Sequence, residues 1–321
     1  MRVLVLSAGR RTTLVRLFAE ALAPIGGTVI VADVDGLAPA AHLGHDAFRV
    51  PRVNSPDYEE ALLALVRDNA VGAVIPTIDT ELLPLSRARQ RLSELGCRAI
   101  VSHRDLLEVA ADKLQTAEVF AADQIRVPRW WTPESALQDP SLPGELFVKP
   151  RFGSASEGAQ PVTTETLIDV LASLDRPIIQ ERVSAQEVTV DALFDFDSKP
   201  IHYVPRHRIK TLGGESIQGV TIDDAQSTSW IKKVLGSLSR LGASGPITIQ
   251  YFETNDEPTL LEINPRFGGG FPLGHAAGGK YPEWIIEMLS GETPHDRLGD
   301  YRRGLYMTRT MTERFLSSPL W

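Results

Sequence analysis

Short apolar runs alternate with amphipathic stretches along the first third of the chain. Runs rich in Val, Ile and Ala predict strands at residues 3–7, 29–33, 71–76 and 98–101. Apolar residues spaced three and four apart predict helices at residues 12–23, 56–69, 80–94 and 104–110. Strands that alternate with helices in this way are typical of a parallel sheet wound with helices. The pattern therefore predicts a Rossmann-like domain over residues 1–110.

The pattern changes after residue 110. One helix is followed by a Pro-rich connection that runs to Gly144, and then by a compact unit of strand, loop, helix and strand. The strands of this unit are expected at residues 146–149 and 177–181 and its helix at 165–173, so a mobile lid is predicted at about residues 115–180. Further strands are predicted at 187–196, 201–209, 245–253 and 259–263, with helices at 226–241 and 282–290. The turn at residues 255–258 is expected to close a hairpin. The sequence thus predicts a second, α+β domain over residues 111–321.

Composition narrows the class of protein. The chain has 321 residues, 43% of them hydrophobic and 23% charged, and carries a formal net charge of −8. This balance argues against nucleic acid or an anionic membrane as a partner, because such partners usually require a basic face. The single cysteine, Cys97, excludes an intramolecular disulfide and a cysteine metal cluster. No apolar run approaches the length needed to span a membrane. We therefore expect a cytoplasmic protein.

The turn after the first predicted strand indicates whether the domain binds a nicotinamide dinucleotide. It reads Ser7-Ala8-Gly9-Arg10-Arg11 and lacks the three glycines of a dinucleotide fingerprint. Asp33 does stand at the end of the second strand, where a ribose-binding acid can lie. Without the glycines we do not expect a nicotinamide cofactor.

Two oxygen-bearing side chains end one predicted strand. Glu262 and Asn264 are two residues apart in Leu260–Arg266, so both point to the same face of that strand. A carboxylate beside a carboxamide suits Mg²⁺. The alternative is an ordinary strand that ends in an Asn-Pro turn.

A loop of small residues follows another predicted strand. Gly153-Ser154-Ala155-Ser156-Glu157-Gly158 comes shortly after Lys149-Pro150, and small residues let backbone N–H groups approach phosphate oxygens. The Gly-Lys-Ser or Gly-Lys-Thr of a P-loop is absent. The loop predicts a different phosphate grip, or else a flexible surface turn.

Taken together, these motifs resemble the ATP-grasp family of the carbamoyl-phosphate synthase large subunit and biotin carboxylase type. The resemblance covers nearly the whole chain. It implies a Rossmann-like pre-ATP-grasp domain at residues 1–110 and an ATP-grasp domain at 111–321 that contains the lid. The chain has one grasp unit, no glutaminase region and no cysteine nucleophile motif, and ends soon after the grasp domain.

The resemblance implies specific roles for residues in the second domain. ATP would be held by two lysines, by the lid loop, by a hinge strand that offers backbone groups to adenine, and by a ribose-binding acid. These are Lys113 and Lys149; Gly153, Ser154, Ser156 and Gly158; Gln180, Glu181 and Val183; and Glu187. Mg²⁺, or alternatively Mn²⁺, would be held by Gln250, Glu262 and Asn264, while Arg266 and Lys149 would be catalytic.

Each of these assignments has an alternative. Lys113, Glu181, Glu187 and Gln250 can also be read as solvent-facing side chains on a helix or strand. Glu253 would replace Gln250 as a ligand if the register of that strand differs from the family pattern.

A basic stripe points to the second substrate. Arg206, Arg208 and Lys210 alternate along one predicted strand and share a face if the strand is regular, and a turn is expected at residues 213–216. Such a stripe suits a carboxylate or phosphate-bearing substrate, and an exposed basic edge strand is the alternative. His275 closes a glycine-rich run that resembles a loop beside the acceptor pocket of related ligases. This histidine is either a base or substrate contact, or it satisfies the turn.

The implied reaction joins a small carboxylate to an amine such as an amino acid. The carboxylate would attack the γ-phosphorus of ATP to give an acyl phosphate, which the amine then attacks. The alternatives are carbamoyl-phosphate-synthase-like phosphorylation of bicarbonate or carbamate, and a non-catalytic ATP-binding regulatory protein. The expected partners are small molecules, with a homodimer suggested by the resemblance.

Overall fold

The N-terminal part of the chain forms a five-stranded parallel sheet. The computed structural model describes residues 1–153, 158–212 and 215–321. The strand order is β3 (Asp46–Arg49), β2 (Thr28–Asp33), β1 (Arg2–Leu6), β4 (Ala73–Ile75) and β5 (Arg98–Ala99). The accompanying helices are α1 (Thr12–Leu22), α2 (Tyr58–Asp68), α3 (Leu82–Glu94) and α4 (Arg104–Ala111), with short 3-10 turns at Ala23–Ile25, Ala41–Leu43 and Asp79–Glu81. In β1, Val3 and Val5 face one core while Leu4 and Leu6 face another, so the strand is buried on both sides and its sequence is continuously apolar.

The C-terminal part is built on a six-stranded antiparallel sheet. Its order is β14 (Thr259–Asn264), β13 (Gly245–Glu253), β10 (Gln186–Phe194), β11 (Pro200–Leu212), β12 (Glu215–Thr221) and β15 (Tyr306–Thr308). Helices α8 (Thr228–Arg240), α9 (Phe271–Ala276) and α10 (Tyr281–Leu289) accompany it. Apolar residues of α8 pack with those of β10, β11, β13 and β14 in one core. This core also contains Leu106 of α4 and Phe120 of α5 (Lys113–Ala122).

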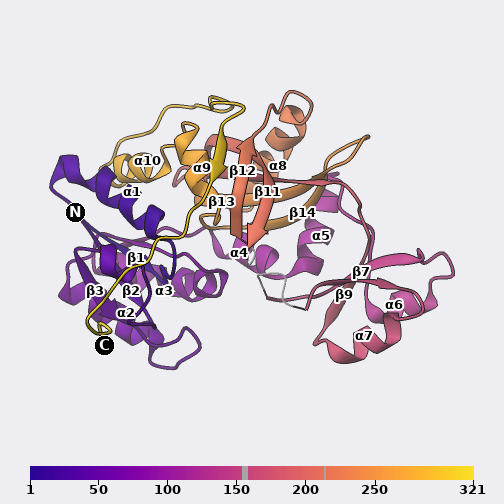
Figure 1. The fold of residues 1–321 in the computed structure, drawn as a ribbon, viewed down its shortest axis with the longest axis horizontal. Coiled ribbons are helices and arrows are strands. Elements are labelled where there is room, and N and C mark those ends of the chain that lie inside the picture. Colours follow the sequence, from indigo (N-terminus) through magenta and orange to yellow (C-terminus); the bar gives the residue numbers. More distant parts are fainter. Residues whose placement is uncertain (154–157, 213–214) are drawn as a thin grey trace.

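A small four-stranded sheet stands apart from these two parts. Its antiparallel strands are ordered β6 (Trp130–Trp131), β9 (Pro177–Glu181), β7 (Glu145–Pro150) and β8 (Gln160–Thr163), with α6 (Pro133–Gln138) and α7 (Leu167–Ser173) packed beside them. The unit has a core of its own, which includes Trp131, Leu146 and Ile179. Figure 1 shows it projecting at the right, away from the N-terminal sheet.

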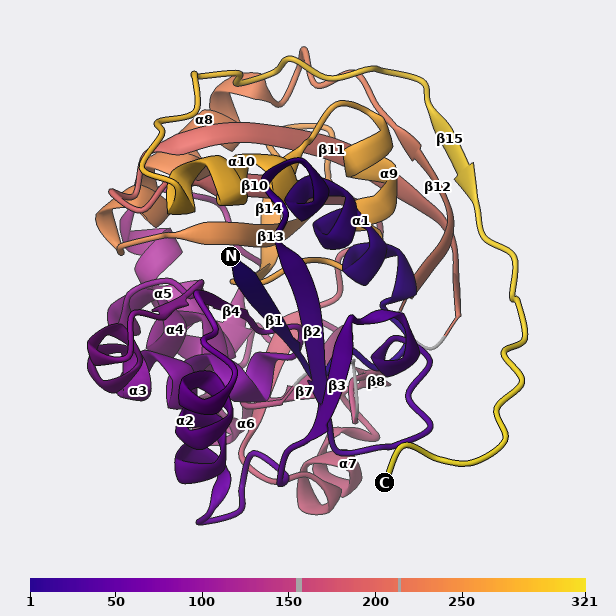
Figure 2. The same ribbon diagram turned by 90° about the vertical axis from the view of Figure 1, so that its left-hand side faces the viewer.

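The N-terminal and six-stranded sheets, by contrast, share a core. Helix α1 packs on α10, and Phe18 meets Phe267 edge-to-face with ring centroids 5.8 Å apart. The last residues add a further link, because the chain runs from β15 along the outside of the molecule and returns to the N-terminal sheet (Figure 2). There the Leu320 amide donates to the Gly36 carbonyl at 3.2 Å. Among the described residues, the small sheet is thus the unit that takes part in no apolar core shared with another unit.

Most predicted elements are confirmed. The strands and helices of the first sheet are present, and α5 begins at Lys113 with Asp112 as its N-cap. The hairpin predicted at residues 255–258 joins β13 to β14. Helix α5 packs against α4 and β14 rather than on the small sheet, so residues 115–122 of the predicted lid segment belong to the body.

Several elements were not predicted. Residues 215–221 form β12, which was not predicted and whose first two residues overlap the turn expected at 213–216. The buried positions of this strand are Ser216, Gly219 and Thr221, which give no apolar signal. The Pro-rich connection contains β6 and α6, and the glycine-rich run before His275 contains α9. Edge strands β3 and β15 are short and only partly buried, so their periodicity is weak. No helix among the described residues combines the length and apolar character needed to cross a membrane.

The junction of the first and second parts yields a stability prediction. Ser102 Oγ donates to the Ser244 carbonyl at 3.2 Å and accepts from the Ser244 amide at 3.0 Å, and both residues are buried. Ser102→Ala leaves both backbone groups unpaired. We expect it to lower the free energy of unfolding by about 1–3 kcal/mol, measured by urea denaturation. Ser173→Ala, which removes an exposed hydroxyl that bonds only to the Val170 carbonyl, should change it by less than about 0.5 kcal/mol; equal effects would contradict the assignment.

Candidate functional site

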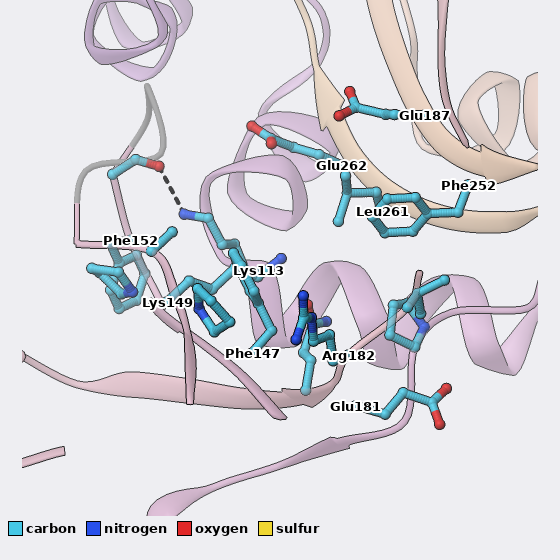
Figure 3. Close-up of a pocket in the computed structure, with 17 residues that line it drawn as sticks. Lys113, Phe147, Lys149, Phe152, Glu181, Arg182, Glu187, Phe252, Leu261 and Glu262 are labelled. Carbon is cyan, nitrogen blue, oxygen red and sulfur yellow. Dashed lines mark hydrogen bonds between the residues drawn. The ribbon is translucent and has the colours of Figure 1, made fainter. Parts of the chain in front are cut away.

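A cavity of about 370 Å³ lies between the small sheet and the six-stranded sheet. We call it the inter-sheet cavity. Strands β7 and β9 supply one wall, and β10, β13 and β14 supply the other, as Figure 3 shows. Its lining includes these residues predicted from the sequence: Lys113, Lys149, Gly153, Gln180, Glu181, Val183, Glu187 and Glu262.

Lys113 is positioned by the start of α5. The Asp112 carboxylate caps the helix by accepting from the Leu114 and Gln115 amides, and it also receives two hydrogen bonds from Arg151, at 2.7 and 2.6 Å. The next side chain, Lys113, therefore leaves the helix at a fixed point. Its Nζ donates to the Gly153 carbonyl at 2.8 Å, drawn as the dashed line in Figure 3.

Lys149 is the more deeply buried of the two lysines, with 6% of the residue exposed. Burial disfavours the ammonium and lowers the pKa of Lys149 to about 8, although Glu262 acts in the opposite direction and Lys113 adds to the decrease. None of the ion pairs among the described residues includes Lys149, and a buried charge without such a partner is unusual. An anion beside it would stabilise the protonated form.

Pairing of β13 with β14 aligns the predicted metal ligands. Gln250 lies opposite Glu262, and Thr248 lies opposite Asn264. The Asn264 amide donates to Gln250 Oε1 at 3.2 Å, and Gln250 Nε2 donates to Glu187 Oε1 at 2.6 Å. Residues from three adjacent strands are thus joined by side-chain hydrogen bonds.

Arg266 continues this chain into the N-terminal part of the molecule. Its guanidinium donates to Asn264 Oδ1 at 3.2 Å and to Asp79 Oδ2 at 2.9 Å. Asp79 follows strand β4, so the N-terminal sheet contributes directly to the site. Arg266 Nε is buried without a hydrogen-bond partner.

The oxygen atoms of this set fit a magnesium ion. Within the described residues, no three His, Cys, Asp or Glu side chains gather closely enough to hold a metal by themselves. Here one carboxylate, Glu262, is combined with the amide oxygens of Gln250 and Asn264. Protein sites for Mg²⁺ commonly use one or two carboxylates and leave the remaining positions to water and phosphate oxygens. The set therefore suits a magnesium ion shared with a phosphate ligand.

A second cavity, of about 240 Å³, lies beyond Gln250 and Asn264. We call it the arginine cavity, because Arg11, Arg206, Arg208 and Arg266 line it. Arg206 is 2% exposed and donates to the equally buried Asp191 at 2.8 Å. Within residues 1–153, 158–212 and 215–321, its Nη1 finds no hydrogen-bond partner, and neither does Thr189 Oγ1 on the neighbouring strand. A buried cation and a buried hydroxyl thus line this cavity with bonding capacity unused.

The loop that borders the arginine cavity requires glycine for reasons of space. A Cβ on Gly270 would lie 2.4 Å from Arg206 Nη1, and one on Gly268 would lie 2.8 Å from Thr248 Oγ1. The backbone therefore packs directly against the side chains of the six-stranded sheet. This contact holds Arg206 in place.

A third cavity, of about 440 Å³, adjoins the second. We call it the outer cavity. Both are lined by Arg11, Glu215, Gly268 and Gly269, and the outer cavity adds Arg10, Arg309 and residues 310–312 of the C-terminal segment. The two cavities therefore lie next to each other, on either side of these four shared residues.

Some predicted residues lie elsewhere. Gly158 has a positive φ of 72° but does not line the inter-sheet cavity, and Ser154 and Ser156 are outside the described residues. The register of β11 shifts on both sides of Lys210, whose side chain is exposed and lines none of the three cavities.

His275 lies on α9, outside all three cavities. Its Nε2 is 3.1 Å from Lys280 Nζ. Burial, together with Lys280, lowers the pKa of His275 to about 4. The imidazole is therefore neutral near pH 7.

Sequence reasoning missed residues that come from other elements. Asp79 and Thr77 follow β4, Arg11 precedes α1, and Thr189 and Asp191 are inward-facing positions of β10. One usable signal was present: Asp191 is an acid within an apolar strand, which requires a partner. Asp79 and Arg11 gave no comparable signal, because their proximity to Arg266 and Phe267 arises only in the folded chain.

Comparison with known families agrees with this geometry. Residues 3–100 match the family model for the PylC-like N-terminal domain. Residues 173–312 match the model described as ATP-grasp in the biosynthetic pathway with Ter operon. The chain is also 22% identical over 269 residues to the carbamoyl phosphate synthase large chain of Clostridium perfringens, covering 77% of this chain and 24% of that protein. It spans only about a quarter of the length of the curated relatives it matches.

Solved structures show the same fold. The biotin carboxylase domain of Hydrogenobacter thermophilus 2-oxoglutarate carboxylase, in complex with MgADP and bicarbonate, has a TM-score of 0.78 at 14% identity, covering 95% of this chain and 73% of that one. N5-carboxyaminoimidazole ribonucleotide synthetase from Thermus thermophilus has a TM-score of 0.72 at 19% identity, covering 92% and 80%. The chain thus combines a region that matches the PylC-like N-terminal model with a region that matches an ATP-grasp model, in the fold that these two solved structures share.

Proposed function

We propose that the protein is an ATP- and Mg²⁺-dependent ligase that activates a small carboxylate as an acyl phosphate and joins it to an amine. The observation that carries the proposal is the continuous series of polar side chains between two cavities. Lys149 and Glu262 line the inter-sheet cavity, and Gln250 and Asn264 lead from there to Arg266 in the arginine cavity. A nucleotide in the first cavity would direct its terminal phosphate toward the second.

The walls of the inter-sheet cavity suit the parts of ATP. Lys113, Lys149 and the backbone at Gly153 form a phosphate end. At β9 and the segment that follows, Gln180, Glu181 and Val183 would border adenine, while Glu187 would accept from the ribose. Glu187 already accepts from Gln250 and pairs with Arg208, so its carboxylate is held in one orientation.

Gln250, Glu262 and Asn264 would hold the metal against the phosphates. A magnesium ion bound there would neutralise charge on the terminal phosphates. Lys113 and Lys149 would also neutralise phosphate charge, without contacting the metal. Because the protein contributes position and charge, and forms no covalent bond, most of the rate enhancement would come from alignment of the two substrates.

The acid would lie in the arginine cavity. Its carboxylate oxygen attacks the γ-phosphorus and ADP leaves, which gives the acyl phosphate. The amine nitrogen then attacks the activated carbonyl and inorganic phosphate leaves. Arg266 would stabilise the negative oxygen as it forms. Movement of the small sheet over the nucleotide would exclude water from the acyl phosphate, and the separate core of that sheet supports such a movement.

The runner-up is phosphorylation of bicarbonate or carbamate, as the carbamoyl phosphate synthase relatives suggest. Bicarbonate has only four heavy atoms. The arginine cavity has a volume of about 240 Å³ and the outer cavity one of about 440 Å³. This space favours a larger acid. We also propose a cytoplasmic location, because a single cysteine fits a reducing compartment. A homodimer is proposed from the family resemblance.

The proposal predicts the behaviour of Glu262→Gln. Loss of the carboxylate charge should reduce Mg²⁺-dependent ADP release by at least about 100-fold, because a metal contributes several kcal/mol to transition-state stabilisation. The measurement is ADP release from purified protein against a panel of amino acids and small carboxylates. An ADP signal that depends on one acid would identify half of the substrate pair.

The matched control is Glu253→Gln. Glu253 lies on the neighbouring strand β13, is exposed, pairs with His207 and lines none of the three cavities. Its replacement should leave ADP release within about twofold. Wild-type turnover in Glu262→Gln would show that the metal assignment is wrong.

The lowered pKa of Lys149 predicts that the protein takes up protons when nucleotide binds. With a pKa of about 8, Lys149 is about half protonated at pH 8 in the free protein, and a bound phosphate favours the charged form. Binding of MgADP at pH 8 should therefore take up about half a proton, measured by calorimetry in buffers of different ionisation enthalpy. Uptake should vanish at pH 6.5, where the lysine is already charged, and in Lys149→Arg at pH 8. If Lys149→Arg took up as many protons as the unmodified protein, the uptake would belong to a group other than Lys149.

A further inference from the structure

We propose that the substrate acid carries a second anionic group at its far end, a carboxylate or a phosphate, which binds in the outer cavity. The inference rests on the proposed function and names the class of acid. Its evidence is the distribution of charge along the space formed by the arginine and outer cavities. Six arginines line that space, against two acids, Asp79 and Glu215; the arginines are Arg10, Arg11, Arg206, Arg208, Arg266 and Arg309. The whole chain has a net charge of −8, so this local excess is not a property of its composition.

The arginines nearest the metal ligands are already paired. Arg206 is paired with Asp191, Arg208 with Glu187 and Arg266 with Asp79. A single carboxylate at this end therefore meets cations whose charge is largely balanced. Orientation there would come from Arg266, beside the buried Arg206 and Thr189 that also line the cavity.

The outer end has the larger imbalance. Arg309 is paired with Glu215 at 3.2 Å, and Arg11 donates to the Phe267 carbonyl at 3.1 Å. The ion pairs found among the described residues include neither Arg10 nor Arg11. Three guanidiniums thus share one carboxylate in a partly enclosed space.

Electrostatic effects on these side chains agree with a missing anion. Burial and the nearby Arg266 lower the pKa of Arg11 to about 10. The pKa of Arg309 is also lowered, by burial first, and Arg206 and Arg10 contribute to the decrease. Glu215 opposes both decreases and Asp79 opposes that of Arg11, but burial and the neighbouring guanidiniums outweigh them, so an anion bound among these side chains would stabilise their charged forms.

The polar part of the outer cavity wall suits an anion more than a cation, while apolar residues such as Leu14 and Phe271 complete the wall. Besides the arginines it presents the hydroxyl-bearing residues Thr12, Thr13, Thr310 and Thr312. Hydroxyls and guanidiniums are both donors to carboxylate and phosphate oxygens. Because both cavities are lined by Gly268 and Gly269, an elongated molecule that lies across these glycines would reach both ends.

The test compares acids that differ only at the far end. Butyrate, glutarate and 4-phosphonobutyrate, with their shorter and longer homologues of two to six carbons, are titrated by calorimetry into the full chain with Mg²⁺ and a non-hydrolysable ATP analogue. We expect the best two-anion acid to bind at least about tenfold more tightly than its one-anion partner. The same comparison distinguishes a carboxylate-terminated from a phosphate-terminated acid.

Variants locate the preference. Arg309→Gln should reduce the advantage of the two-anion acid at least fivefold. Arg302→Gln, an exposed arginine of the same segment that lines neither cavity, should leave it unchanged. Equal binding of the two series, absence of binding by both, or an unchanged preference in Arg309→Gln would overturn the proposal.

The outcome is separable from that of the proposed function. These titrations measure binding without turnover, whereas ADP release tests the ligase reaction. An acid-dependent ADP signal without a two-anion preference would reject the outer anion site alone. A two-anion preference without ADP release under any condition would reject the ligase alone.

Discussion

Antiparallel pairing of β13 with β14 is the constraint on which the site depends. It places Gln250 opposite Glu262 and Thr248 opposite Asn264, and β10 on the other side of β13 adds Thr189 opposite Gln250. A shift of one residue would turn every one of these side chains to the opposite face of the sheet. The same pairing sets the start of the loop that carries Arg266. The proposed metal ligands, Arg266 and the wall of the arginine cavity thus depend on one register.

The sequence was most informative where a polar residue interrupts an apolar run. Lys149, Glu262 and Asn264 stand in otherwise apolar strands, and burial of such groups requires a functional or structural partner. The alternation of strands and helices likewise predicted the N-terminal sheet. These signals are local, since a few neighbouring residues contain them.

The remainder depends on contacts between distant segments. Asp79 meets Arg266 across 187 positions and Arg11 meets Phe267 across 256, and no short pattern encodes either contact. The irregular register around Lys210 separates it from Arg206 and Arg208, although simple alternation placed all three on one face. Strand β12 escaped prediction because small polar residues occupy its buried positions. The roles of the predicted residues in binding ATP and metal remain predictions, while their proximity is a structural fact.

The path of the C-terminal segment has a consequence for the order in which the site is assembled. Every residue named for the inter-sheet cavity lies between Lys113 and Glu262, so that part of the chain contains all the groups it needs. The outer cavity instead requires Arg10 and Arg11 near the start of the chain and Arg309 to Thr312 near its end. Contacts of such high sequence separation form late, because they close the longest loops. A chain emerging from the ribosome would therefore be able to complete the inter-sheet cavity first, while the outer cavity still lacked the wall that the C-terminal segment supplies.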